Sequence, residues 1–322
     1  MKKTSTSYAE YLKIPPKKFY DLGVLNPILD KDVNLFIDPR LLKNSRYEMF
    51  NTFATKTYET FYKSLAGNIK AYLQLTDDKI KTKAKQNIIK KLTAKEPVGL
   101  GLGYSKSGTN GQGVGKYNAE ILFKNALDIY KCVPNIGEEA FSLLNLLSEV
   151  IGADYIGDIT ANIIMYELVK FTESTAKKLN ISTEKFIMNG SEFMLPVHPN
   201  STIKKRYPVL LVPKDILSEL PKDADMKDVL EGYADKNRQI RTDIDEKILN
   251  ILKQEHIEKK DKQIQIFDIL KEIPELIEEL TKYMSSLEGN KYDFEKDSKG
   301  IIIRDKLLDY LIVTLKLKLI TI

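Results

Sequence analysis

The chain has 322 residues, of which 43% are hydrophobic and 30% are charged, and its formal net charge is +5. This composition is typical of a soluble globular protein, and the length allows two domains. One cysteine and two histidines exclude a disulfide framework, a cysteine-based zinc site and a histidine-rich metal centre. Any metal site would have to use carboxylates with Mg²⁺, Mn²⁺ or Ca²⁺.

The sequence also indicates where the protein works. No segment approaches the roughly 20 apolar residues that a membrane-spanning helix needs. No apolar stretch follows the two lysines near the N-terminus, so a secretory signal is not expected. We therefore expect a cytoplasmic protein without membrane contact. Its mild basicity permits contact with nucleic acid without requiring it.

The first half of the chain is predicted to be mainly helical. Residues 34–38 have strand character and end at Pro39. Apolar residues at helical spacing predict a helix from 46 to 75, and Asp77 and Asp78 cap a second, lysine-rich helix that ends at Leu92. Further helices are expected at 118–130, 138–150 and 159–179.

The second half combines short strands with a charged helical end. Asn189-Gly190 between apolar runs predicts a hairpin over 186–195, and 207–212 indicates a buried strand. These two regions and 34–38 would form one small sheet. Residues 225–288 are nearly all charged residues with Leu and Ile, which favours helices, and 312–322 alternates like a strand. The expected fold is α+β, predominantly α-helical with a small β-sheet. A core domain (1–221) and a charged helical segment (222–322) are expected.

A glycine-rich stretch runs from Gly99 to Gly115 and is followed by Lys116; it holds seven of the 16 glycines. Its exposed N–H groups, with Ser105, Lys106, Ser107 and Lys116, would suit a phosphate or another anion. It is not a Walker A loop, because Asn110 stands where that motif needs glycine. A flexible connector between two helices is the equally weighted alternative.

Four acidic residues lie beside predicted turns: Asp38, Glu120, Asp154 and Asp158. If one helix includes both Asp154 and Asp158, their carboxylates share a face with Asn162, as a Mg²⁺ or Mn²⁺ site would require. The alternative roles are structural. Asp158 would be a helix N-cap, Asp38 a turn residue before proline, and Glu120 a first-turn acid favoured by the helix dipole.

Basic residues cluster at 81–91, at Lys204-Lys205-Arg206 and at 236–241. A lysine-rich helix face is usually no more than a solvated surface. The group Lys204, Lys205 and Arg206 precedes the expected strand on a loop, so it is the better candidate for contact with phosphate.

Several segments together resemble an uncharacterised prokaryotic family whose members are often encoded near mobile-element and phage-defence genes. The segments are Leu22–Pro27, Leu35–Leu42, Leu102–Thr109, Ile151–Asn162, Val212–Ile216 and Tyr292–Asp297. Longer relatives continue into a C-terminal half with a PD-(D/E)XK-like nuclease pattern. This chain has no Glu-x-Lys on a strand in that position, so the resemblance implies the sensing or partner-binding half.

Two hypotheses follow. The first is a non-catalytic component of a phage-defence or restriction-type system that binds nucleic acid or a protein from the same defence operon. The second is a nuclease that uses Mg²⁺ or Mn²⁺ at Asp38, Asp154 and Asp158, with Glu120 as a further candidate. The first is favoured, because the sequence contains no complete catalytic motif.

Overall fold

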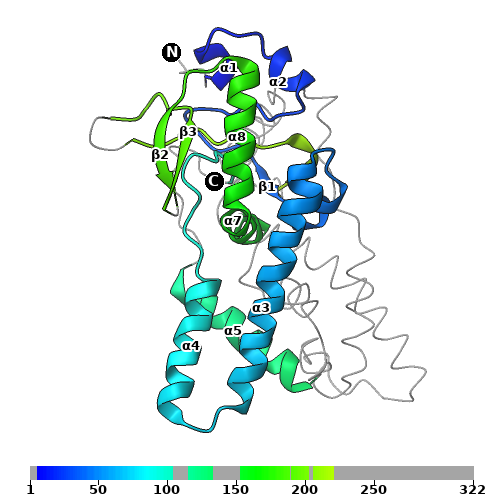
Figure 1. Cartoon of the computed structure of the whole chain (residues 1–322), viewed down its shortest axis with the longest axis vertical. Helices are drawn as coiled ribbons and strands as arrows, with labels where there is room; N and C mark the ends of the chain where they lie inside the picture. Colours follow the sequence, from blue (N-terminus) through cyan, green and yellow to red (C-terminus); the bar gives the residue numbers. More distant parts are fainter. Residues whose placement is uncertain (1–5, 104–114, 133–152, 189, 203–205, 221–322) are drawn as a thin grey trace, which may run out of the picture.

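In the computed structural model, the described residues are 6–103, 115–132, 153–188, 190–202 and 206–220. They form a body with a long helical extension below it in Figure 1. The expected α+β fold, mostly helical with little sheet, is confirmed. The predicted elements at 138–150, 225–288 and 312–322 lie outside the described residues, so the division at 221 stays a prediction.

The body contains most of the short elements, together with two packed helices. The elements are α1 (Tyr8–Tyr11), α2 (Lys17–Asp21), β1 (Leu35–Ile37), the 3₁₀ helix η1 (Pro39–Asn44), α7 (Ala153–Ile163), α8 (Met165–Leu179), β2 (Glu184–Met188), β3 (Ser191–Leu195), the 3₁₀ helix η3 (Lys214–Ile216) and β4 (Leu217–Glu219). The main apolar core lies between α8, the N-terminal segments and residues 209–217.

Three longer helices form the extension, which we call the lysine arm: α3 (Thr55–Gln74), α4 (Asp78–Leu92) and α5 (Lys116–Cys132). The π-helical turn η2 (Met49–Ala54) leads from the body into α3. The three helices pack against one another through their own apolar residues, including Leu65, Ile69, Ile88, Leu92 and Leu122, none of which belongs to the main core. The predicted cap of the second helix is confirmed, because the Ile80 N–H donates to Asp77 Oδ1 at 2.9 Å.

The sheet prediction is partly wrong. The hairpin is confirmed as β2 and β3, which pair antiparallel on either side of residues 189 and 190. It does not join the first strand, however. Instead β1 pairs antiparallel with β4, with Ile37 opposite Leu217, so two separate two-stranded sheets form.

The segment 207–212 is buried from Pro208 onward, as predicted, but it is not a strand. Its N–H groups bond to three unrelated acceptors: Val209 to Pro196 O, Leu210 to Gly99 O and Leu211 to Thr172 Oγ1. These acceptors do not belong to one strand, so no ladder can form. The buried backbone is satisfied all the same, as burial requires.

The helix predicted at 159–179 is two helices. The first, α7, begins at Ala153, and α8 begins at Met165. Ile164 between them has φ −95° and ψ 22°, outside the helical range, and this residue interrupts the helix. The earlier start of α7 decides the position of two of the predicted acidic residues.

Candidate functional site

The two aspartates of α7 are one helical turn apart. Because α7 begins at Ala153, Asp154 lies in its first turn and Asp158 lies inside the helix. One helix therefore includes both aspartates, so their carboxylates share a face as predicted. The alternative prediction, that Asp158 is a helix N-cap, is wrong. The side-chain amide of Asn162 donates to two backbone carbonyls, of Lys95 at 2.6 Å and of Asp158 at 2.7 Å.

Close packing of α7 against β1 brings further carboxylates to this pair. A Cβ built on Gly157 would lie 2.9 Å from Phe36 Cβ, so a larger residue could not be placed there without moving α7. Asp32 precedes β1 and is buried. A Cβ built on Gly103 would lie 3.2 Å from Asp154 Oδ1 and 3.6 Å from Asp32 Oδ2, so both carboxylates border the same glycine. We call Asp32, Glu96, Asp154 and Asp158 the acidic cluster.

The cluster makes its own carboxylates hard to ionise. Burial and, after it, the charges of Asp154, Glu96 and Asp32 raise the pKa of Asp158 to about 8. Burial and the charge of Glu96 raise the pKa of Asp154 to about 6. Both causes disfavour the charged form of an acid. Both shifts favour the protonated form, and the shift is larger at Asp158 than at Asp154.

Carboxylates of this kind could bind a hard cation or transfer a proton. Across the parts of the chain that the structure describes, however, no group of three or more His, Cys, Asp or Glu side chains is arranged to hold a metal ion. The sequence prediction missed Asp32 and Glu96. No local signal marks either of them, because both reach Asp158 only through the packing of α7.

Asp38 belongs to a different environment. Its side chain is buried and accepts hydrogen bonds from Arg40 Nε at 3.0 Å, Arg40 Nη2 at 2.8 Å and Ser218 Oγ at 2.9 Å. It also accepts from the Arg40 N–H and so caps η1. These bonds join η1 to β4, so the structural role predicted for a turn residue before proline is the one that the structure displays.

The remaining predicted residues are dispersed. Glu120 is exposed on α5, where its carboxylate lies 3.9 Å from Lys116 Nζ. Arg206 pairs with Glu184 of the hairpin. Ser105, Lys106, Ser107, Lys204 and Lys205 lie outside the described residues.

The first part of the glycine-rich stretch has a structural role. Gly101 O accepts from the Val33 N–H, and the Gly103 N–H donates to Val33 O, both at 3.0 Å. Gly99 O accepts from Leu210 at 2.8 Å. Residues 99–103 thus join the N-terminal segment to residue 210, while 104–114 lie outside the described part.

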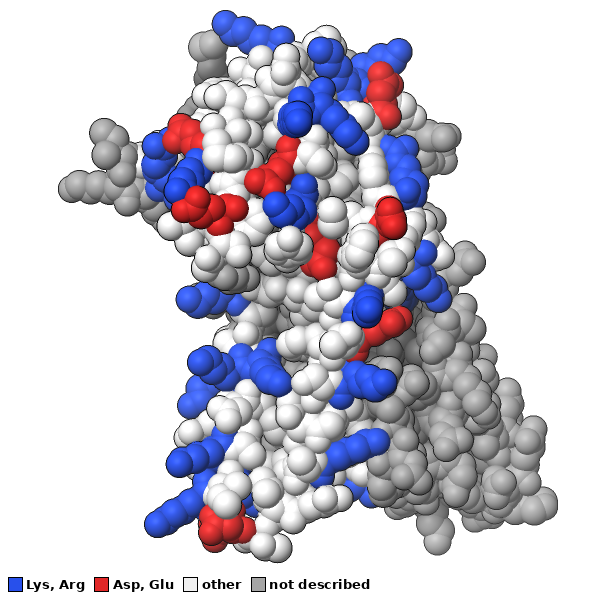
Figure 2. Space-filling model, in the orientation of Figure 1, with Lys and Arg blue, Asp and Glu red and all other residues white. Residues whose placement is uncertain are grey.

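The lysine arm is strongly basic. Its three helices contain twelve lysines, no arginine and four acidic residues, a net charge of +8 against +5 for the whole chain. Figure 2 shows lysine side chains spread over the lower part of the molecule, whereas both signs are interspersed over the body. All the excess positive charge therefore resides on this arm.

One face of α4 presents these charges in a row. Lys79, Lys83, Gln86 and Lys90 follow each other at spacings of four, three and four residues, so they share a face, and all four are exposed. We call them the α4 stripe. Among the described residues, none of the lysines of α3 and α4 has a carboxylate within ion-pair distance. Lys81 and Lys85 lie over the rings of Tyr72 and Phe123, on the side facing the neighbouring helices.

Most of the chain matches a known protein family. The family model described as "Domain of unknown function (DUF8370)" matches residues 13–224. The chain belongs to the DUF8370 family. No curated protein and no solved structure matches it significantly.

The DUF8370 match includes the acidic cluster, Asp38 and the entire lysine arm. Both the carboxylates and the basic helices are thus within the region that defines the family. None of the helices that the structure describes is long and apolar enough to cross a membrane.

Proposed function

We propose that the protein binds nucleic acid through the lysine arm, without catalysing a reaction on it. The observation that carries this proposal is the net charge of +8 on three packed helices, in a chain whose total charge is +5. A concentrated positive surface attracts the phosphate backbone irrespective of base sequence. The resemblance to a prokaryotic family encoded near phage-defence genes supports a role in such a system.

The α4 stripe is the expected centre of the contact. Lysine ammonium groups are point charges on long flexible stems, which suits contact with successive phosphates rather than with bases. Among the described residues the stripe lysines have no carboxylate partner, so their charges are available to an external polyanion.

A variant with Lys79, Lys83 and Lys90 all changed to Gln tests the proposal. Fluorescence anisotropy with labelled single- and double-stranded DNA and RNA, over a series of salt concentrations, measures the affinity. Each phosphate contact contributes about 0.9 to the slope of log K against log salt on duplex DNA, so we expect the slope to fall by roughly 3. Affinity at low salt should fall by at least about 100-fold.

The matched control changes three exposed lysines of the body, Lys17, Lys18 and Lys177, to Gln. It removes the same charge and should bind almost as tightly as the wild type. Equal losses in the two variants would mean that only total charge matters and would overturn the assignment to the arm. No retention of any nucleic acid by the wild type would favour a protein partner instead.

Metal-dependent cleavage is a second candidate function, for which the acidic cluster is the specific observation. Asp154 and Asp158 share a helix face, and Asp32 borders the same glycine as Asp154. If a cation binds there, Mg²⁺ or Mn²⁺ should raise the melting temperature at pH 8, because the ion offsets the repulsion between the carboxylates.

The same nucleic acids, incubated with Mg²⁺, Mn²⁺ or EDTA, test for cleavage directly. We expect intact substrates and retention that is equal in the wild type and in a variant with Asp154→Asn and Asp158→Asn. Metal-dependent cleavage by the wild type that is lost in this variant would instead establish a nuclease. Asp30→Asn, which changes an exposed aspartate, is the control variant and should then still cleave.

A further inference from the structure

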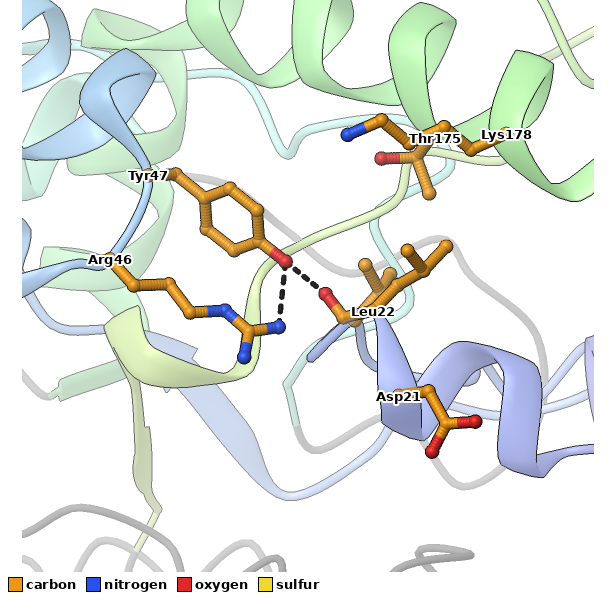
Figure 3. A pocket seen from close by; sticks show the side chains of 7 residues that line it. Asp21, Leu22, Arg46, Tyr47, Thr175 and Lys178 are labelled. Carbon is orange, nitrogen blue, oxygen red and sulfur yellow. Dashed lines mark hydrogen bonds between the residues drawn. The ribbon is translucent and has the colours of Figure 1, made fainter.

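A pocket of about 230 Å³ lies in the body, between α2, the segment before η2 and the last turns of α8. Figure 3 shows the side chains that line it, among them Arg46, Tyr47, Thr175 and Lys178. None of the residues that line the pocket belongs to the lysine arm or to the acidic cluster.

Arg46 is held in place at this pocket. Its Nη2 donates to Tyr47 Oη at 2.9 Å, and its guanidinium carbon lies 4.9 Å from the centroid of the Tyr47 ring. The Tyr47 hydroxyl in turn donates to the carbonyl of Leu22. The main chain at Arg46 is fixed as well, because its N–H donates to Asp215 Oδ2 at 2.8 Å. Most donors of the guanidinium therefore remain available, on an exposed side chain that the Tyr47 hydroxyl and ring help to orient.

Gly23 makes this position of Arg46 possible. Its φ is +58°, and a Cβ on this residue would overlap Arg46 Nη2. A side chain at residue 23 would thus be strained in its backbone and would displace the guanidinium.

The opposite wall adds a second cation and a hydroxyl. Lys178 and Thr175, both from α8, line the side of the pocket opposite Arg46 (Figure 3). Thr175 is buried, with 3% of its surface exposed. The carboxylate of Asp21, the one acid at the pocket, points away from both cations. Within the described part of the chain, neither Arg46 nor Lys178 forms an ion pair.

We infer that this pocket binds the phosphate group of a phosphate monoester. Two exposed cations without carboxylate partners and a hydroxyl donor line the two walls of a small pocket, and this donor set suits a phosphate dianion. A water molecule takes up about 30 Å³ of liquid, so the pocket has room for the phosphate and for part of the group that carries it. Inorganic phosphate is the simplest probe.

Isothermal titration calorimetry with inorganic phosphate tests the inference. We expect one site per chain, with affinity reduced by at least about tenfold in Arg46→Gln and in Lys178→Gln. Lys177→Gln is the matched control, because Lys177 is the exposed neighbour on the same helix and does not line the pocket. Absence of binding by the wild type at about 10 mM phosphate, or equal affinity in all four proteins, would overturn the inference.

Gly23→Ala is an independent variant, since it leaves every charge in place while it displaces the guanidinium and strains the backbone at residue 23. It should weaken phosphate binding as Arg46→Gln does, while circular dichroism reports that each variant is folded. Unchanged affinity in a folded Gly23→Ala protein would contradict the assigned role of Arg46.

Two further ligands identify the source of the phosphate. Ribose 5-phosphate represents a free monoester, and an oligonucleotide with or without a 5′-phosphate represents a nucleic-acid end. A preference for the phosphorylated end that Arg46→Gln abolishes would assign the pocket to nucleic-acid termini. Binding of ribose 5-phosphate without such a preference would assign it to a small metabolite. The variant of the α4 stripe should bind inorganic phosphate normally, so the two proposals can fail separately.

Discussion

Changing Asp38 to Ala should lower the free energy of unfolding by about 2–3 kcal/mol, because the substitution removes a buried carboxylate that accepts several hydrogen bonds and caps η1. The buried carboxylate accepts from Arg40 at two side-chain nitrogens and from the Ser218 hydroxyl. Without it, the guanidinium loses its ion pair, and the buried Ser218 hydroxyl loses its acceptor. Urea denaturation followed by circular dichroism measures the loss.

Ser218→Ala is the matched control for this prediction. It removes a single hydrogen bond of the network and should cost about 1 kcal/mol. A folded Asp38→Ala protein with wild-type stability would contradict the structural role. If such a protein had also lost metal-dependent cleavage, Asp38 would belong to an active site instead.

The second large effect concerns pH. The pKa of Asp158 is about 8 in the folded protein, against 3.8 for an unperturbed aspartate. Between these values the folded state binds more protons than the unfolded state, so stability is fully present below pH 4 and is lost as the pH rises through 8. Asp154, with a pKa of about 6, adds to the same trend in the lower part of this range.

Asp158→Asn should therefore stabilise the protein at pH 8 and flatten the dependence of its stability on pH. One pKa unit corresponds to about 1.4 kcal/mol, and solvent screening at this partly exposed site reduces the total, so we expect a gain of about 2 kcal/mol. Urea midpoints at pH 5.5 and 8.5 measure it, with Asp30→Asn as an exposed control. Stability of the wild type that rises from pH 5.5 to 8.5 would contradict the sign.

The sequence allowed the elements with local signals to be predicted. The cap at Asp77 and the turn at Gly190 act over a few residues, and both predictions are confirmed. The pairing of β1 with β4 depends on residues far apart in the chain, and the short segment 217–219 carries no strand pattern of its own. The prediction for 207–212 failed for the same reason, because its backbone partners come from three distant segments.

The acidic cluster, too, could be predicted only in part from the sequence. The spacing of Asp154 and Asp158 predicts that they share a helix face, and they do. Asp32 and Glu96 approach this pair only because α7 packs against β1. The same packing leaves Asp38 without an effect on the pKa of Asp158. The α4 stripe was visible in the sequence as a lysine cluster, but its significance depends on the charge of the two neighbouring helices.

The pairing of β1 with β4 has a consequence for the order of events during synthesis. The contacts between α3 and α4 are local in sequence, so that pair can form soon after its own residues have left the ribosome. The body cannot close until residues 217–219 are available to pair with 35–37. At roughly 5–20 residues per second, β1 therefore waits on the order of ten seconds or more for its partner. During that interval β1 is an unpaired apolar segment that chaperones could bind, while the first two helices of the arm can already pack against each other.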